Sequence, residues 1–390
     1  MADLDILRRG TEEILPKGRL EEQLASGKPL RVKLGIDPTA PDIHLGHVVV
    51  LTKLAQFQEQ AHQVILIIGD YTARVGDPSG REKQRPILTP EEIKANAKTF
   101  QDQAFKVLDR DRTEVRFNSE WLEMPAQELF RLMAKVTVAR LLEREDFTKR
   151  MDADQPISSL ELLYPILQGY DSVAIRSDVE LGGTDQKFNL LFAREIQRAY
   201  DIPEQSIITL PILPGIDGVR RMSKSLGNYV GVTDPPEEMF GKLMRIPDEA
   251  MGAYYELLLG EPAPDRDPMR AKRALARRIV ERFHDAAAGE AAEARFDTVH
   301  VAREIPEDIP EVSLAEADGV QPNGGEVHLP ALIAGVFDIS TSEARRLIAQ
   351  GGVKLDGEGV ASESLDLPVG KLGGRVLQVG KRRFVRLLAP

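Results

Sequence analysis

Residues 35–47 constrain the fold of this chain more than any other stretch. They read Gly-Ile-Asp-Pro-Thr-Ala-Pro-Asp-Ile-His-Leu-Gly-His and overlap an apolar run, residues 30–36, that is typical of a buried parallel strand. After the proline-bracketed loop, Asp42 fits a helix N-cap, and we expect a helix to continue from 48 to 60 and to end at Ala61 and His62. The stretch therefore predicts a strand, a short loop and a helix.

Two histidines lie in the first turn of this predicted helix. His44 and His47 are three positions apart and share one face, where unpaired backbone N–H groups and the helix dipole favour an anion such as a polyphosphate. Gly46 leaves room for a flat group such as adenine, and Gly35 does the same at the strand end. The histidines could also be a cap and a core residue. A protein metal site is not expected, because no glutamate follows at a metalloprotease spacing and the chain has no cysteine.

A second apolar run, residues 64–69, predicts another buried strand, so the first strand, the helix and this strand form a right-handed crossover unit. Such units build a doubly wound parallel sheet of the Rossmann type, in which ligands bind beyond the carboxyl ends of the strands. Thr89, followed by Pro90 and Glu92, predicts a further capped helix. The expected fold class is α/β, with this nucleotide-binding domain followed by an α-helical domain and a small α+β domain.

A second motif, Arg-Met-Ser-Lys-Ser, occupies residues 221–225 and is followed by Leu-Gly-Asn. With His-Leu-Gly-His it resembles the two signatures of class I aminoacyl-tRNA synthetases, and residues 34–228 resemble the bacterial, tyrosine-specific branch of that family. The resemblance implies an ATP-dependent ligase that joins L-tyrosine to tRNA(Tyr) through a tyrosyl-adenylate. The alternatives are the tryptophan-specific branch and a non-catalytic RNA-binding relative, which would be expected to lack the histidines or Lys224.

Tyr164, Gln168 and Asp171 lie on one face of a predicted helix. In the family, residues at the matching places form the tyrosine pocket, and the aspartate accepts the hydrogen bond of the phenol. Phenylalanine would leave that buried acceptor unpaired, a principle for which tyrosyl-tRNA synthetase itself is the usual example. Many bacterial members have a tyrosine where this chain has Lys33. Lys33 could donate to the phenol, lie outside the pocket or pair with Asp171.

The resemblance assigns roles to further residues. Matching residues in the family hold the substrate amino group (Thr72, Asp77), the ribose (Asp185) and the region of the substrate carboxyl group (Gln186). The residues expected to act in catalysis, with Mg²⁺ on the leaving group, are His44, His47, Lys224, Arg81 and Arg85. The residues expected to bind ATP are Asp37, Thr39, His44, Gly46, His47, Gly183, Asp185, Met222, Ser223, Lys224 and Ser225. The residues expected to bind tyrosine are Gly35, Thr72, Asp77, Tyr164, Gln168, Asp171 and Gln186.

The domain organisation follows from length and composition. A chain of 390 residues with 42% hydrophobic residues can bury more than one core. We expect a catalytic domain at 1–228, with a helical insertion at about 120–158 that forms the dimer interface in the family. An α-helical domain, which the resemblance implies binds the anticodon arm, is expected at 229–305. It is followed by a proline- and glycine-rich linker at 306–326 and a small basic domain at 327–390.

Charge and cysteine content indicate which partners the protein binds and where in the cell it is expected. The net charge of −11 argues against a general nucleic-acid binder, but residues 327–390 carry nine Lys and Arg against six Asp and Glu. This tail resembles a small RNA-binding module, and Arg345, Arg346 and Lys354 are expected to contact tRNA. The absence of cysteine, of an apolar signal core at the N-terminus and of a run long enough to cross a bilayer predicts a cytoplasmic protein without a membrane partner. The resemblance implies a homodimer.

Overall fold

The computed structural model describes residues 4–39, 41–79, 89–264, 267–298, 309–315, 325–361, 365–380 and 383–389. The chain divides into two compact units, Met1–Gly289 and Glu290–Pro390, which are described separately. The first unit contains the helices α1 (Leu4–Arg8), α2 (Arg19–Ala25), α3 (Leu45–Glu59), α4 (Thr72–Val75), α5 (Pro90–Ala104), α6 (Ser119–Leu122), α7 (Ala126–Met133), α8 (Val138–Leu142), α9 (Glu145–Asp152), α10 (Ser159–Ala174), α11 (Lys187–Ala199), α12 (Pro236–Leu243), α13 (Met251–Tyr254) and α14 (Pro268–Phe283). Its strands are β1 (Glu13–Leu15), β2 (Arg31–Ile36), β3 (Gln63–Ile68), β4 (Thr113–Phe117), β5 (Val179–Gly183) and β6 (Ser206–Leu210), and α15 (Ala286–Phe296) spans the boundary between the units.

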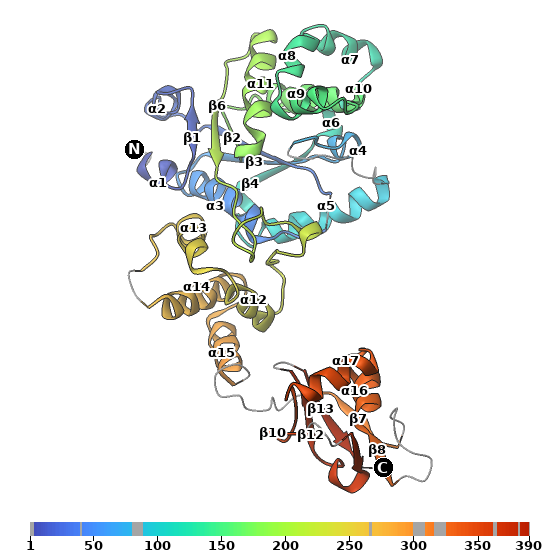
Figure 1. Cartoon of the computed structure of the whole chain (residues 1–390). Helices are drawn as coiled ribbons and strands as arrows, with labels where there is room; N and C mark the ends of the chain where they lie inside the picture. The colour runs from blue at the N-terminus through green and yellow to red at the C-terminus, as the bar shows by residue number, and fades with distance from the viewer. Residues whose placement is uncertain are drawn as a thin grey trace. The chain divides into compact units, whose positions relative to one another are not determined.

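A six-stranded sheet in the order β1-β6-β5-β2-β3-β4 forms the centre of the first unit. β1 is antiparallel to β6, and the other five strands are parallel to one another. Helices α3 and α5 lie on one side of this sheet, and α10 and α11 lie on the other (Figure 1). The strand order reverses at β2, which pairs with β3 on one side and with β5 on the other. The predicted doubly wound α/β fold is confirmed, and its switch point lies between β2 and β5.

Local sequence explains most of these elements. β3 reads Gln-Val-Ile-Leu-Ile-Ile, and every residue after Gln63 is buried, as expected for a strand covered on both faces. The capped helix predicted at Thr89 is confirmed, since Thr89 and Glu92 form a reciprocal capping box at the start of α5. The predicted Asp42 cap is wrong: the N-cap of α3 is His44, and the helix ends at Glu59.

The segment before β2 contains a strand, β1, that the sequence pattern did not indicate. β1 pairs with β6 through Glu13 and Thr209, Ile14 and Ile208, and Leu15 and Ile207. The segment predicted as an insertion is helical, as expected, and consists of α6 to α9. Its buried side chains include Leu132 and Phe147. No helix in the described part of the chain is both long and apolar enough to cross a membrane.

The second unit is built on a five-stranded sheet in the order β10-β9-β12-β13-β7, with a separate pair β11-β8. Its elements are β7 (Glu311–Ser313), β8 (Glu326–His328), α16 (Leu329–Phe337), α17 (Thr341–Ala349), β9 (Val353–Leu355), β10 (Glu358–Gly359), β11 (Asp366–Pro368), β12 (Val376–Val379) and β13 (Arg383–Leu388). Leu332, Ile348 and Leu377 belong to its buried core. β7 falls within the predicted linker and pairs in parallel with β13, so this part of the segment belongs to the second unit's sheet.

We predict that Gly169→Ala lowers the free energy of unfolding by about 1–3 kcal/mol, because helices α10 and α11 pack closely at this position. A Cβ at Gly169 would lie 2.8 Å from Ile196 Cγ1 and 3.3 Å from the Ala193 Cα. Gly241→Ala in α12 is the matched control. Nothing lies within 4 Å of its added Cβ, so it should be neutral or stabilising by up to about 1 kcal/mol. Urea unfolding of both variants measures the difference, and equal stabilities would contradict the prediction.

Candidate active site

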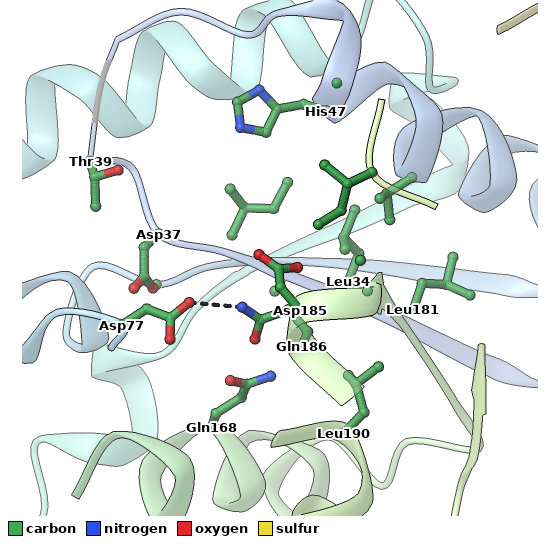
Figure 2. A pocket seen from close by; sticks show the side chains of 18 of the residues that line it. Leu34, Asp37, Thr39, His47, Asp77, Gln168, Leu181, Asp185, Gln186 and Leu190 are labelled. Atoms are coloured by element: carbon green, nitrogen blue, oxygen red, sulfur yellow. Dashed lines mark hydrogen bonds between the residues drawn. The ribbon is translucent and has the colours of Figure 1, made fainter. Parts of the chain in front are cut away.

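A pocket of about 320 Å³ opens at the carboxyl ends of β2, β3 and β5, on both sides of the switch point. Figure 2 shows His47 on one side of it and Gln168 on the opposite side, with Asp37, Asp77 and Asp185 between them. Every residue predicted to bind tyrosine lines this pocket, and so does every residue predicted to bind ATP except Lys224 and Ser225. Arg81 and Arg85 lie outside the described residues. The structure thus brings segments from β2 to the loop after β6 to one cavity.

The two histidines stand at the first turn of α3. Their ring centroids are 3.9 Å apart, and the backbone N–H of His44 donates to His47 Nδ1 at 3.3 Å. Burial lowers the pKa of His44 to about 2 and that of His47 to about 4, and the positive charge of Lys224 contributes to both shifts. Both imidazoles are therefore neutral near pH 7 and can offer N–H donors. A Cβ on Gly46 would lie only 3.0 Å from the His44 ring, which explains the glycine between them.

Asp37 lies with the residues predicted to bind tyrosine. Its carboxylate accepts hydrogen bonds from Thr72 Oγ1 at 2.6 Å and from the Tyr164 hydroxyl at 2.9 Å. Burial, together with the negative charge of Asp77, raises the pKa of Asp37 to about 7, although the hydrogen bonds from Thr72 and Tyr164 oppose this shift. The sequence predicted that Asp37 contacts ATP. Its position beside Thr72 and Tyr164 makes it a candidate contact for the substrate amino group as well.

Asp171 is buried and is held by two side chains that the sequence analysis did not identify. Trp121 Nε1 donates to Asp171 Oδ1 at 2.8 Å, and Asn118 Nδ2 lies 3.5 Å from Oδ2 and also donates to Thr72 Oγ1 at 2.9 Å. Burial raises the pKa of Asp171 to about 7, opposed by Lys33 and by these hydrogen bonds. Asn118 directly follows β4, so the rule that ligands bind at the carboxyl ends of parallel strands could have pointed to it.

A third missed residue, Arg144, supports the Asp77 side of the pocket. Gln186 Nε2 donates to Asp77 Oδ2 at 2.8 Å (Figure 2), and the Gln186 Oε1 accepts from Asn189 Nδ2 at 3.0 Å. Arg144, which is buried, donates to Asn189 Oδ1 at 3.3 Å and to Ser79 Oγ at 2.9 Å. Its guanidinium lies 3.9 Å from Asp77. It comes from the predicted insertion, where no local pattern separates a buried arginine from an exposed one.

Lys33 does not line the pocket. Its ammonium lies 2.9 Å from Glu180 Oε1 and donates to Ser172 Oγ at 2.7 Å and to the Gln168 carbonyl at 3.3 Å. Of the three possibilities for this residue, the structure therefore places it outside the pocket lining, with Glu180 as its charged partner.

The second signature meets the first at the start of α3. Leu45 N donates to the Val230 carbonyl at 3.0 Å, and Met222 is buried against the Gly46 turn. Lys224 forms an ion pair with Asp42. On the other side of the pocket, burial raises the pKa of Asp185, and Arg221 lies 3.9 Å from its carboxylate.

The residues predicted to contact tRNA belong to the second unit. Arg345 and Arg346 are exposed on α17, and Lys354 is half-buried on β9. Arg346 lies 3.9 Å from Glu343, and Arg345 Nη2 lies 3.4 Å from His328 Nε2.

A doubly wound sheet with paired histidines and a Met-Ser-Lys-Ser loop at its switch point defines a nucleotide-binding enzyme of the class I synthetase type. Residues 25–300 match the family described as tRNA synthetases class I (W and Y), and the chain belongs to that family. A Tyrosine--tRNA ligase of Moorella thermoacetica is 51% identical over 98% of this chain and 95% of its own length. A Tyrosine--tRNA ligase of Shewanella oneidensis is 49% identical over 99% of both chains.

Solved structures agree on the fold. A tyrosyl-tRNA synthetase from Archaeoglobus fulgidus, complexed with L-tyrosine, matches with a TM-score of 0.61 and 24% identity, over 73% of this chain and 98% of that chain. A C-terminally truncated mitochondrial tyrosyl-tRNA synthetase from Aspergillus nidulans matches with a TM-score of 0.62 and 23% identity, over 76% of this chain and 92% of that chain.

We predict that Asp37→Asn stabilises the protein more at pH 8 than at pH 5. The folded-state pKa of Asp37, about 7, lies above its ordinary value of 3.8, so the folded state binds this proton more tightly than the unfolded state. The native carboxylate therefore costs stability as pH rises from about 4 to 7, and asparagine removes that cost. At pH 8 the free energy of unfolding of Asp37→Asn should exceed that of the native protein by roughly 2–4 kcal/mol. Urea unfolding at both pH values measures it, and a difference independent of pH would contradict the assignment.

Proposed function

We propose that this chain is a tyrosine--tRNA ligase, which activates L-tyrosine with ATP and transfers it to tRNA(Tyr) through a tyrosyl-adenylate. The single observation that carries this proposal is one pocket with neutral histidine donors at one end and the buried Asp171 carboxylate at the other. Asp171, held by Trp121 and Asn118, can accept the hydrogen bond of a phenol hydroxyl. Such an acceptor favours tyrosine over tryptophan, and the names of the bacterial relatives support the same choice.

Binding of tyrosine uses the buried polar groups. Its ammonium suits the carboxylates of Asp37 and Asp77 and the Tyr164 hydroxyl, since a buried carboxylate is stabilised by an opposite charge. Gln186, bonded to Asp77, lies where it can contact the substrate near its carboxyl group. Asp185 can accept the ribose hydroxyls of ATP, as acidic residues commonly do in nucleotide folds.

Activation needs no general base. The substrate carboxylate, with a pKa of about 3.5, is already ionised, and its oxygen attacks the α-phosphorus while the bond to the bridging oxygen of pyrophosphate breaks. His44 and His47 would donate hydrogen bonds to the phosphate oxygens as charge develops. Lys224 would exchange Asp42 for a phosphate, and Arg81 and Arg85 remain proposed partners of the pyrophosphate. The terminal ribose hydroxyl of tRNA then attacks the adenylate carbonyl, the bond between this carbonyl and the phosphate oxygen breaks, and AMP leaves together with the hydroxyl proton.

Mg²⁺ is proposed to arrive with the phosphates of ATP. Among the described residues no group of three His, Cys, Asp or Glu side chains is placed to hold a metal ion, so the residues do not form a dedicated site. Magnesium commonly binds substrate phosphates with few protein ligands. No step above depends on where it binds.

A homodimer is proposed from the surface of the predicted insertion. Phe130, Met133, Val138 and Met151 on α7 to α9 are 65%, 40%, 60% and 50% exposed, and a second copy would cover such apolar side chains. Sedimentation equilibrium should give twice the chain mass of 43.2 kDa. We place the enzyme in the cytoplasm, where its substrates ATP and tRNA are found.

ATP–pyrophosphate exchange with each of the twenty amino acids tests the proposed function, and exchange with tyrosine alone is expected. His47→Ala should slow this exchange by about 10²- to 10³-fold with nearly unchanged tyrosine affinity, because the donor is used mainly in the transition state. Exchange with tryptophan in place of tyrosine, or unaltered exchange in the variant, would overturn these assignments.

The second unit is proposed to bind the tRNA backbone. Arg345→Ala combined with Arg346→Ala should leave adenylate formation unchanged and weaken tRNA binding, and each lost phosphate contact should reduce the salt-dependence slope by about 0.7–0.9. Arg110→Ala, which removes an exposed arginine of the first unit, is the control. Filter binding at several salt concentrations measures the slopes, and charging of tRNA at the native rate by the double variant would contradict the assignment.

A further inference from the structure

A buried ion pair links the two strands at the switch point, and one of its members, Glu180, also lines the pocket. Lys33 of β2 and Glu180 of β5 are register partners in the parallel pairing of these strands. The two charged groups lie 2.9 Å apart, and their side chains are 0% and 1% exposed. Burying two charges is costly unless further hydrogen bonds satisfy them. A buried ion pair often contributes little net stability, so we infer its role from the other hydrogen bonds that Lys33 and Glu180 make.

Those contacts lead to helix α10. Lys33 donates to Ser172 Oγ and to the Gln168 carbonyl, on consecutive turns that flank Asp171. Glu180 accepts from Ser172 Oγ at 3.2 Å, from Gln168 Nε2 at 3.4 Å and from Gln205 Nε2. The ion pair therefore holds both the backbone and the side chains of the helix that carries Gln168 and Asp171.

The contact with Gln168 sets the orientation of its amide. An ionised carboxylate can only accept hydrogen bonds, so Glu180 must face the NH₂ group of Gln168. The opposite end of the amide, Oε1, is then turned away from Glu180. It is buried and has no hydrogen-bond partner within the described part of the chain, although Gln168 lines the pocket. A buried acceptor without a protein partner is free to accept a hydrogen bond from a donor that arrives with the ligand.

We propose that Glu180, fixed by Lys33, is a positioning residue that presents Gln168 Oε1 to a donor of the bound tyrosine. This proposal rests on the proposed function. The single phenol proton is assigned to Asp171, so the donor to Gln168 Oε1 is the ammonium of tyrosine, and ATP is proposed to bind on the histidine side. The effect of the pair should therefore fall on tyrosine and leave ATP unaffected.

Paired variants separate this role from a structural one, because both remove the ion pair without leaving a lone buried charge. K33M/E180M removes the Glu180 carboxylate that accepts from Gln168 Nε2, whereas K33M/E180Q keeps a carbonyl that can accept there. The tyrosine Kd should rise about tenfold in K33M/E180M, as expected for one misdirected hydrogen bond, and stay within about threefold of the native value in K33M/E180Q. The Kd for ATP should be unchanged in both. Equilibrium dialysis with labelled tyrosine and labelled ATP measures these constants.

Arg150→Met is the control for general loosening of α10. Arg150 forms a largely buried ion pair with Glu161 in the first turn of that helix but does not line the pocket. The Arg150→Met variant should have a lower free energy of unfolding than the native protein and an unchanged tyrosine Kd. The inference is overturned if K33M/E180M binds tyrosine as well as the native chain, if both double variants lose affinity equally, or if Arg150→Met reproduces the loss. Absence of tyrosine-dependent exchange in the native chain would instead overturn the proposed function, and this inference with it.

Discussion

Parallel pairing of β2 with a strand on each side is the constraint on which the site depends. β2 pairs with β3 over its whole length and with β5 at Val32 and Lys33, so its carboxyl end lies where the strand order reverses. At a switch point the connections that leave the two neighbouring strands run to opposite faces of the sheet: β2 leads to α3 on one face, and β5 leads to α11 on the other (Figure 1). This arrangement leaves a crevice that is open to a ligand. Asp37, Thr72 and Gln186 all follow strands of this sheet and therefore meet there although they are far apart in the chain.

Burial then determines the chemistry of the groups that meet. Removal from water disfavours the charged form of every titratable group, so it raises the pKa of Asp37 and Asp171 and lowers the pKa of His44 and His47. The pocket consequently combines neutral imidazole donors with buried carboxylates, whose charged form an ammonium or a phenol hydroxyl would stabilise further. Stability and binding oppose each other at these residues, as is common at functional sites.

The two signatures act together because they are joined in space. The loop that follows β6 lies against the first turn of α3, through the Val230 carbonyl and through Met222. In this arrangement Lys224 is paired with Asp42, so the chain itself holds the lysine next to the place where phosphates are expected. The helices of the predicted insertion contribute as well, since Arg144 reaches the Asp77 side of the pocket from beyond α8.

The sequence by itself determined the class of fold and predicted many of the residues that line the pocket. Apolar runs at β2 and β3, glycines at strand ends and the spacing of the histidines are local patterns, and each is set by backbone geometry and by burial on both faces of a sheet. Only the tertiary structure decided the partner of Lys33, the grouping of Asp37 with Thr72 and Tyr164, and the roles of Trp121, Asn118 and Arg144. β1 and β7 were missed for the same reason. These features depend on contacts between residues distant in the chain, and the energy of a long-range contact leaves no periodic pattern in the sequence around either partner.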